Sequence, residues 1–169
     1  MDILEAIHTR RSIRKFQDRS VSDELVQKLL TAAMDAPSAR NAQPWQFVVI
    51  TDRPALGEIG RTFPNAPMAK SAPLGVLVCG DLDLEKSPGY WVVDCAAAVE
   101  NMLLAAHGLG LGAVWTGVYP RQERMDGLRR MFHVPDGVMP HSLVLVGYAA
   151  EQRGTEDRYR PDRVHRERW

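Results

Sequence analysis

Apolar residues recur at helical spacing in several stretches of the chain. The first stretch is short and spans residues 3–7. The second is expected to begin after Ser22, whose hydroxyl suits a helix N-cap. It should end near Ala36, because Pro37 disfavours helical geometry in the residue before it. Further helices are predicted at residues 54–63, 90–109 and 120–132.

Runs of consecutive apolar residues predict the strands, at Gln46–Thr51, Leu74–Cys79, Gly112–Gly117 and Ser142–Gly147. Leu74–Cys79 and Ser142–Gly147 are almost continuously apolar, which is typical of strands buried on both faces. Helices and strands alternate along the chain, but not in strict strand–helix–strand order. The pattern therefore predicts an α+β fold with a mixed central sheet flanked by helices.

The longest predicted helix, Tyr90–Leu109, is apolar on nearly every face. Such a helix must be buried on all sides, and in a chain this short a second subunit is expected to cover part of it. Asp94 and Asn101 interrupt the apolar pattern, and we expect each to satisfy a polar partner in the interior. Glycines at the end of this helix, in G-L-G-L-G, follow a helix rather than a strand, so we interpret them as a helix C-cap and turn.

Composition narrows the possible partners. The 169 residues are 45% apolar and suit one domain with a substantial core. Lys and Arg together number 21, as do Asp and Glu, and this balance argues against nucleic-acid binding. Cys79 and Cys95 lie in apolar surroundings and indicate reduced thiols of a cytoplasmic protein. No signal peptide, membrane-spanning segment or metal site is expected.

A basic cluster follows the first predicted helix. Arg10, Arg11, Arg14 and Lys15 fall within six residues, with the hydroxyl of Ser12 among them. Guanidinium groups donate paired hydrogen bonds to phosphate oxygens, so this cluster suits a small phosphate dianion. A solvated basic turn without a ligand is the alternative.

Residues 150–169 are rich in arginine and poor in apolar side chains. They are either a disordered tail or an arm that Tyr159 and Trp169 anchor elsewhere. The sequence contains none of the common signatures of a nucleophilic serine, a Walker loop or a zinc protease.

Three stretches together resemble the nitroreductase family of flavin enzymes. They are R-R-S-I-R-K-F at 10–16, A-P-S-A-R-N-A-Q-P-W-Q-F at 36–47 and G-L-G-A-V-W-T-G at 110–117. The resemblance is in order and extends over nearly the whole chain. It implies a single domain over residues 1–169 with a C-terminal arm from about residue 150, a mainly antiparallel sheet, and an intertwined homodimer with an FMN site at each subunit interface.

The resemblance also implies which residues contact the cofactor. Arg10, Ser12 and Arg14 match positions that hold the phosphate and ribityl chain, and Arg11 matches a variable neighbour near the flavin. The remaining implied positions are Pro37, Ser38, Ala39 and Asn41 in a loop that the partner subunit places over the isoalloxazine ring, Asn65 at the pyrimidine edge, Trp115, Thr116 and Gly117 near N5, and Arg158 and Arg160 at the phosphate.

The implied activity is ping-pong hydride transfer from NADH or NADPH, through N5 of FMN, to a nitroaromatic, a quinone or a similar small conjugated acceptor. No catalytic side chain is expected, because the cofactor carries the chemistry.

Two positions depart from the family pattern. Met68 stands where many members have a lysine at the flavin's pyrimidine edge, and Lys70 is a nearby substitute. The connection at 81–88 is also short, which predicts an open site next to Tyr90 and Trp91.

Other functions remain open at this level. The chain could be a flavin-consuming or dehalogenating relative, although the short connection argues mildly against this. It could be a flavin-binding module for storage or sensing, without turnover. It could also be a small anion-binding scaffold that takes no flavin. The preference between NADH and NADPH is likewise open, because a 2′-phosphate pocket needs only one well-placed arginine.

Overall fold

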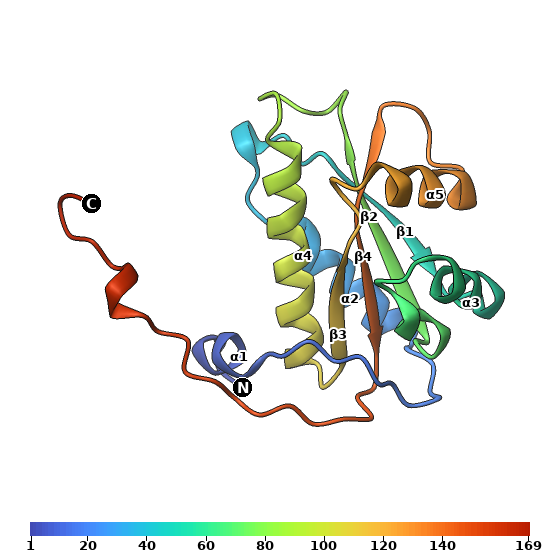
Figure 1. Cartoon of the computed structure of the whole chain (residues 1–169), viewed down its shortest axis with the longest axis horizontal. Coiled ribbons are helices and arrows are strands. Elements are labelled where there is room, and N and C mark those ends of the chain that lie inside the picture. The colour runs from blue at the N-terminus through green and yellow to red at the C-terminus, as the bar shows by residue number, and fades with distance from the viewer.

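The computed structural model describes residues 1–169, and a four-stranded sheet lies at its centre (Figure 1). The strands are β1 (Trp45–Ile50), β2 (Leu74–Asp81), β3 (Gly112–Gly117) and β4 (Val138–Gly147), in the spatial order β1-β2-β4-β3. All three neighbouring pairs are antiparallel, and a parallel bridge joins Ser12 to Ala113 at the edge of β3. The predicted α+β class with a mainly antiparallel sheet is confirmed.

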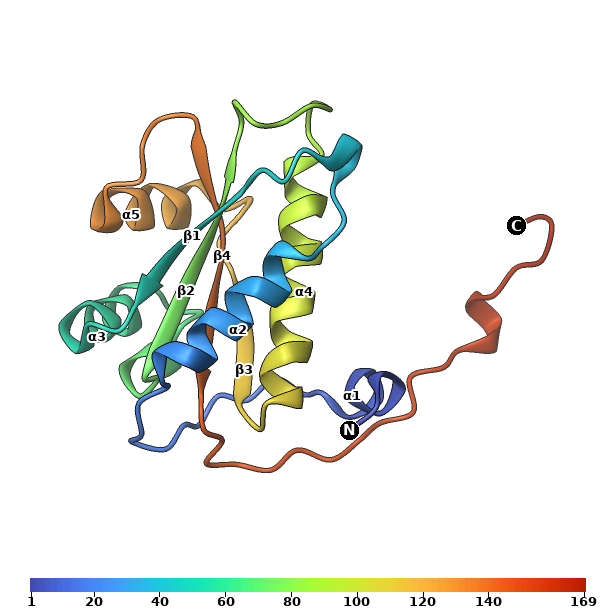
Figure 2. The same cartoon turned by 180° about the vertical axis from the view of Figure 1, so that it is seen from behind.

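Helices cover both faces of the sheet. Figure 2 shows α2 (Asp23–Met34) and α4 (Trp91–Gly108) on one face, with α3 (Arg53–Thr62) and α5 (Gln122–Phe132) on the other. The short helix α1 (Ile3–Thr9) lies away from the sheet, beside the C-terminal end of α4. The predicted helices therefore all form, within one or two residues of their expected ends.

Alternation along the central strands divides the core into two halves. Val76 and Val78 of β2 pack under α2 and α4, whereas Leu77 and Cys79 pack under α3 and α5. All four side chains are almost completely buried, because successive residues of a strand point to opposite faces. This confirms that β2 is covered on both sides.

Strand β4 begins at Val138, earlier than the apolar run at 142–147 suggests. Pro140 lies within the added part, where it is opposite Cys79 and next to a register shift in β2. A proline cannot donate a ladder hydrogen bond and is tolerated in a strand at such irregular positions. The local sequence therefore resembles a loop, and only the pairing with β2 makes it a strand.

Two elements leave apolar surface uncovered within one chain. On α1, Ile3, Leu4 and Ile7 are 65%, 74% and 53% exposed. Near the start of α4, Val93 is 57% exposed, although the opposite side of that helix is buried. None of the helices combines the length and the hydrophobicity that a membrane-crossing helix needs.

The C-terminal residues run away from the sheet as an arm. Every residue from Gln152 to Trp169 is exposed, and a short 3-10 turn at Pro161–Arg163 is the only helical element in this part of the chain. Figure 1 shows the arm passing α1 and then leaving the body of the molecule. We call residues 152–169 the C-terminal arm below.

Candidate functional site

A basic cavity lies where the chain that follows α1 meets the start of the C-terminal arm. It has a volume of about 510 Å³, and no apolar side chain lines it. Four of the predicted site residues line it, namely Arg11, Ser12, Arg14 and Arg158. Arg153 completes a set of four guanidinium groups. Residues more than 130 positions apart in the sequence therefore form one concentrated positive site.

Strand pairing holds the basic segment in place. The N–H of Ile13 donates to the Ala113 carbonyl over 2.9 Å, next to the bridge between Ser12 and Ala113. This approach needs a glycine in β3, because a Cβ at Gly112 would lie 2.7 Å from Cγ2 of Ile13. A second bridge joins Phe16 to Ala149. One side of the cavity is thus held against the sheet, and the start of the C-terminal arm forms the other side.

Arg11 is fixed by the backbone around it. Its Nε donates to the Gly154 carbonyl over 3.0 Å, and its Nη1 donates to the carbonyls of His8 and Arg10. Its Nη2 is buried and has no hydrogen-bond partner. A buried, unpaired guanidinium nitrogen is costly, so an acceptor from a bound anion is expected to satisfy it.

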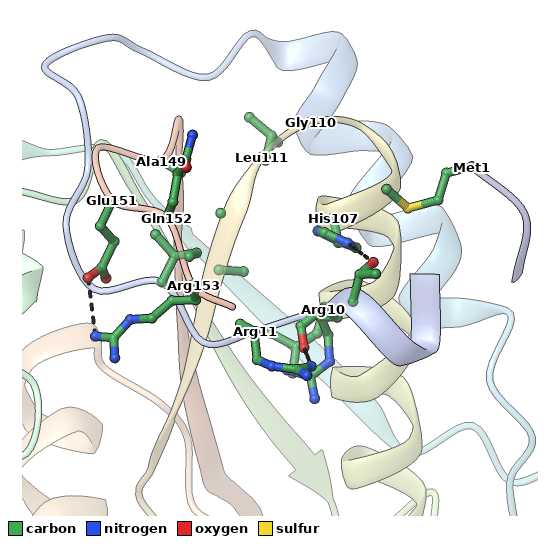
Figure 3. A pocket seen from close by; sticks show the side chains of 15 residues that line it. Met1, Arg10, Arg11, His107, Gly110, Leu111, Ala149, Glu151, Gln152 and Arg153 are labelled. Carbon is green, nitrogen blue, oxygen red and sulfur yellow. Dashed lines mark hydrogen bonds and ion pairs between the residues drawn. The ribbon is translucent and has the colours of Figure 1, made fainter. Parts of the chain in front are cut away.

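Arg10 faces a different cavity, which Figure 3 shows from close by. This second cavity has a volume of about 440 Å³ and also adjoins Arg11 and Arg153. Nε of Arg10 lies 3.3 Å from the Glu100 carboxylate on α4. Arg10 therefore does not line the basic cavity, but it shares the second cavity with Arg11 and Arg153.

His107 also lines the second cavity. Its Nε2 lies 2.7 Å from the hydroxyl of Thr9. Burial lowers the pKa of this imidazole, and the positive charge of Arg10 lowers it further. The ring therefore stays neutral at neutral pH and adds no charge beside Arg10.

Glu151 ties the two sides of the site together. Its carboxylate accepts the backbone N–H groups of Arg14 and Lys15 over 2.6 and 3.2 Å, and it pairs with Arg153 over 3.1 Å (Figure 3). These bonds, with the Arg14 N–H foremost, lower the pKa of the carboxyl. Sequence reasoning missed both Glu151 and Arg153. The available signal was only their place in the arginine-rich C-terminal stretch.

The two arginines predicted in the C-terminal arm differ in position. Arg158 lines the basic cavity and also lies 3.4 Å from Glu156 of the arm. Arg160 hydrogen-bonds carbonyl groups of the arm itself and lines neither cavity. Within one chain, therefore, only Arg158 joins the basic set.

The predicted ring-binding residues lie farther along β3, which is the edge strand of the sheet. Because the Ala113 carbonyl points away from β4, the alternation of an antiparallel pair turns the N–H groups of Trp115 and Gly117 outward as well. The side chain of Thr116 is buried, and its hydroxyl donates to the Leu143 carbonyl over 2.8 Å. By the same alternation its backbone groups face β4, so the structure does not present Thr116 at this free edge.

Two donors converge on the carbonyl oxygen of Gly117. Nδ2 of Asn65 lies 3.0 Å from it, and Nη1 of Arg124 lies 2.9 Å from it. Oδ1 of Asn65 is buried and has no partner. Arg124 comes from α5 and carries no sequence signal beyond being one of several charged residues on an amphipathic helix, so sequence reasoning missed it.

Neither Met68, at the position of the family lysine, nor its nearby substitute Lys70 lies at this point. Met68 is partly buried and packs against the core under α3 and α5. Lys70 is exposed, and its side chain runs next to Gly60 of α3. The cation near Asn65 is Arg124 instead.

The predicted loop around Ser38 is held firmly but lies elsewhere. The N–H of Ala39 donates to Oδ1 of the buried Asp94 over 2.9 Å, so the expected polar partner of Asp94 is a backbone group. The Ser38 hydroxyl accepts from the N–H of Gln43 over 2.9 Å. Arg40, Asn41 and Gln43 all have positive φ angles near 50°, a conformation that side chains rarely adopt. Such a loop persists because its surroundings fix it.

This loop and the basic cavity lie at opposite ends of α4 (Figure 1). The helix has 18 residues, which corresponds to ~27 Å. The residues Pro37, Ser38, Ala39 and Asn41 are therefore not brought together with Arg11, Ser12 and Arg14 within one chain.

An aromatic cluster lies beneath the outer part of β3. The ring of His141 is 5.9 Å from Trp91, 5.8 Å from Trp115 and 6.5 Å from Tyr119, measured between centroids. Burial lowers the pKa of His141 to about 4. The ring is neutral at physiological pH and packs as an apolar group.

The two cysteines are free and buried in the core. Burial raises the pKa of each thiol to about 12. Both are therefore protonated and unreactive, as structural cysteines are.

Comparison with known proteins identifies relatives over the whole chain. Residues 7–62 and 56–148 match the sequence model of the nitroreductase family. The chain is 54% identical over 169 residues to a protein of Methanothermobacter thermautotrophicus named as an NADH dehydrogenase/NAD(P)H nitroreductase, and the alignment covers 100% of this chain and 88% of that protein.

Solved structures agree. A Parabacteroides distasonis protein named in the same way is similar with a TM-score of 0.94 and 41% identity, over 98% of each chain. A Desulfovibrio desulfuricans protein described as a nitroreductase in complex with FMN has a TM-score of 0.85 and 31% identity, over 100% of this chain and 98% of its own.

Proposed function

This chain belongs to the nitroreductase family, and from that premise we propose that it is an FMN-dependent oxidoreductase. It takes hydride from NADH or NADPH and passes it to a small conjugated acceptor, such as a nitroaromatic compound or a quinone. The observation that carries the proposal is the basic cavity, which adjoins an edge strand that turns the N–H groups of Trp115 and Gly117 outward.

The residues present fit FMN. The phosphate is a dianion, and the basic cavity offers Arg11, Ser12, Arg14 and Arg158 as donors. Nη2 of Arg11, which is buried without a partner, is a ready donor to a phosphate oxygen. The unpaired Oδ1 of Asn65 suits an N–H group of the isoalloxazine ring. These groups follow one another along the edge of β3.

The protein's part in the reaction is to bind and orient. FMN supplies the chemistry, because its ring accepts a hydride at N5 and releases it there. The arginines of the cavity hold the phosphate, and the outward N–H groups of Trp115 and Gly117 provide fixed dipoles beside the ring. No acid, base or nucleophile of the chain is needed at the reacting atoms.

A second copy of the chain is part of this proposal. The loop at 37–41 lies ~27 Å from the basic cavity along α4, so it does not reach the phosphate site of its own chain, and we propose that it covers the flavin of the partner. The exposed apolar side chains of α1 and the exposed Val93 of α4 offer the surface for such a contact. We therefore propose a homodimer with one site at each end of the interface.

The acceptor site is proposed to be open. Residues 82–90 form only a short turn between β2 and α4, and Tyr90 is 55% exposed while Trp91 is buried. Tyr90, and not Trp91, is thus the side chain available to stack on a planar acceptor. A wide choice of acceptors follows from this arrangement.

The test is anaerobic reduction of the FMN-loaded protein. Addition of NADH or NADPH should bleach the yellow absorbance of the flavin, and a quinone or nitroaromatic compound should then restore it. Arg14→Ala should bind FMN at least about tenfold more weakly, since one charged hydrogen bond contributes ~1.5–3 kcal/mol. The exposed Arg130 on α5 provides the matched control, and Arg130→Ala should bind FMN as the native chain does.

Three outcomes would contradict the proposal. A protein that takes up FMN but is not bleached by either nucleotide would be a flavin-binding module for storage or sensing. A colourless protein that does not bind added FMN would be an anion-binding scaffold. Bleaching that is reversed only by a halogenated aromatic substrate, with release of halide, would indicate a dehalogenating relative.

A further inference from the structure

Arg124 is a half-buried cation for which the proposed function so far gives no role. It lies on α5, and its Nη1 donates to the Gly117 carbonyl over 2.9 Å. It forms no ion pair with any carboxylate. A partly buried guanidinium without a counter-charge is uncommon, because removing a charge from water is costly unless something compensates it.

The surroundings of Arg124 indicate what compensates it. Asn65 donates to the same carbonyl oxygen over 3.0 Å, so the amide and the guanidinium lie side by side. The Oδ1 atom of Asn65 is buried and lacks a donor. Arg124 donates to the protein only through Nη1, which leaves its other N–H groups for a ligand. Together they offer one acceptor next to several donors, which complements a ring edge that carries an N–H group beside a carbonyl.

The position of the pair along the sheet matches the length of an elongated ligand. The basic cavity lies next to Ala113, and Gly117 lies four residues farther along the same edge strand. At the usual rise per residue this is ~13 Å. A ligand with its phosphate in the cavity and its chain along the edge of β3 would bring its ring to Asn65 and Arg124.

We propose that Arg124 contacts the pyrimidine edge of bound FMN and stabilises the reduced cofactor. This inference rests on the proposed function. Hydride transfer moves two electrons and one proton from NADH or NADPH to FMN, so the reduced ring carries one more negative charge unless it takes up a second proton. A fixed cation at the pyrimidine edge stabilises that charge more than it stabilises the neutral oxidised ring.

The consequence is a higher reduction potential of the bound flavin. Arg124 then supplies the positive charge that Met68 and Lys70 do not, because Met68 packs into the core and Lys70 lies next to α3. A substitution that removes this charge should weaken the binding of reduced FMN more than that of oxidised FMN.

The experiment measures the two-electron midpoint potential of FMN bound to the native chain and to Arg124→Gln. Glutamine removes the charge but keeps a polar amide, and Asn65 still donates to the Gly117 carbonyl, so little loss of structure is expected. We expect the preference for reduced over oxidised FMN to fall about tenfold, which for a two-electron couple is a potential lower by ~30 mV. Arg130→Gln makes the same change in net charge on an exposed part of α5 and should leave the potential unchanged.

Two further variants separate charge from shape. Arg124→Lys keeps the charge and should hold the potential near the native value. Asn65→Asp leaves Arg124 in place but puts a carboxylate beside it, and should lower the potential even if Arg124→Gln does not fold. Native-like potentials in both Arg124→Gln and Asn65→Asp, with FMN bound, would overturn the inference, as would an equal fall in Arg124→Lys. Failure of the native chain to bind FMN would instead reject the proposed function.

Discussion

Individual buried polar residues in this molecule serve structure and site at once. Asp94 is 4% exposed, and its one hydrogen bond, to the N–H of Ala39, fixes a loop that contains three residues with positive φ. Asn101, farther along α4, donates to the Ala32 carbonyl over 3.0 Å and joins α4 to α2. Both partners are backbone groups, which is why a polar residue in an apolar helix indicated an interior bond but not its location.

His141 makes the stability of the protein depend on pH. Its pKa is about 4 in the folded chain, against the ordinary value near 6.5 in the unfolded chain. The unfolded state therefore binds the proton more readily. The stabilisation is complete above about pH 6.5 and is lost as the pH falls towards 4.

We expect this single group to lower the free energy of unfolding by roughly 1–2 kcal/mol between pH 7 and pH 5. Urea denaturation at both values would measure it. His141→Phe keeps an aromatic ring against Trp91 and Tyr119, and its stability should change less over the same range. His165→Gln, in the C-terminal arm, is the control and should retain the native dependence. An unaltered pH dependence in His141→Phe would assign the effect to other groups.

At the level of elements, the apolar face of α1 has no partner that covers it within its own chain. Its spacing of Ile3, Leu4 and Ile7 predicted an apolar face correctly, but that face is exposed within one chain. Periodicity indicates that a helix has a side to bury and does not say which molecule covers it. The same limit applies to α4. The sequence predicts a helix that is apolar on nearly every face, yet Val93 remains exposed within one chain.

A charge on this face should separate the proposed homodimer. Ile7→Glu would place a carboxylate in the contact, so analytical ultracentrifugation at micromolar concentration should detect a shift towards monomer. FMN binding should weaken in parallel, because the loop at 37–41 would no longer reach the partner's flavin. Gln27→Glu, on the exposed side of α2, adds the same charge and should not alter the association state. A variant at Ile7 that sediments like the native chain would exclude α1 from the interface.

On the scale of the whole molecule, the C-terminal arm contributes charge but almost no buried surface. All its residues are exposed, yet Arg153 and Arg158 line the basic cavity.

A chain that ends after Thr155 should therefore fold with a melting temperature close to that of the native apoprotein. Its affinity for FMN should fall about tenfold through the loss of Arg158. Calorimetric titration with FMN would measure this, and an unchanged affinity would show that the arm does not reach the phosphate.

The sequence predicted the fold far better than the site. Helices and strands follow from local patterns, and even the cap at Ser22 forms, with its hydroxyl accepting the Leu25 N–H. The site depends on contacts between distant segments. Arg14 and Arg153 meet only because Glu151 joins them, and Arg124 lies beside Asn65 only because α5 packs next to β3. Local patterns contain no information on such contacts. The resemblance indicated the positions that match the family, but not the residues that lie next to them in this chain, such as Arg153 and Arg124.

The outward N–H groups of β3 also have a consequence for handling the protein. An edge strand with free backbone groups can pair with the edge of another molecule, and proteins commonly blunt or cover such edges. Here the segment at Ser12 covers only the first part of β3, and Trp115 stands beyond it with 37% of its surface exposed. A cofactor lying along the remainder would cover this edge. Apoprotein produced faster than cells supply flavin is therefore expected to aggregate more readily than the loaded form, so added riboflavin would be a practical aid to expression.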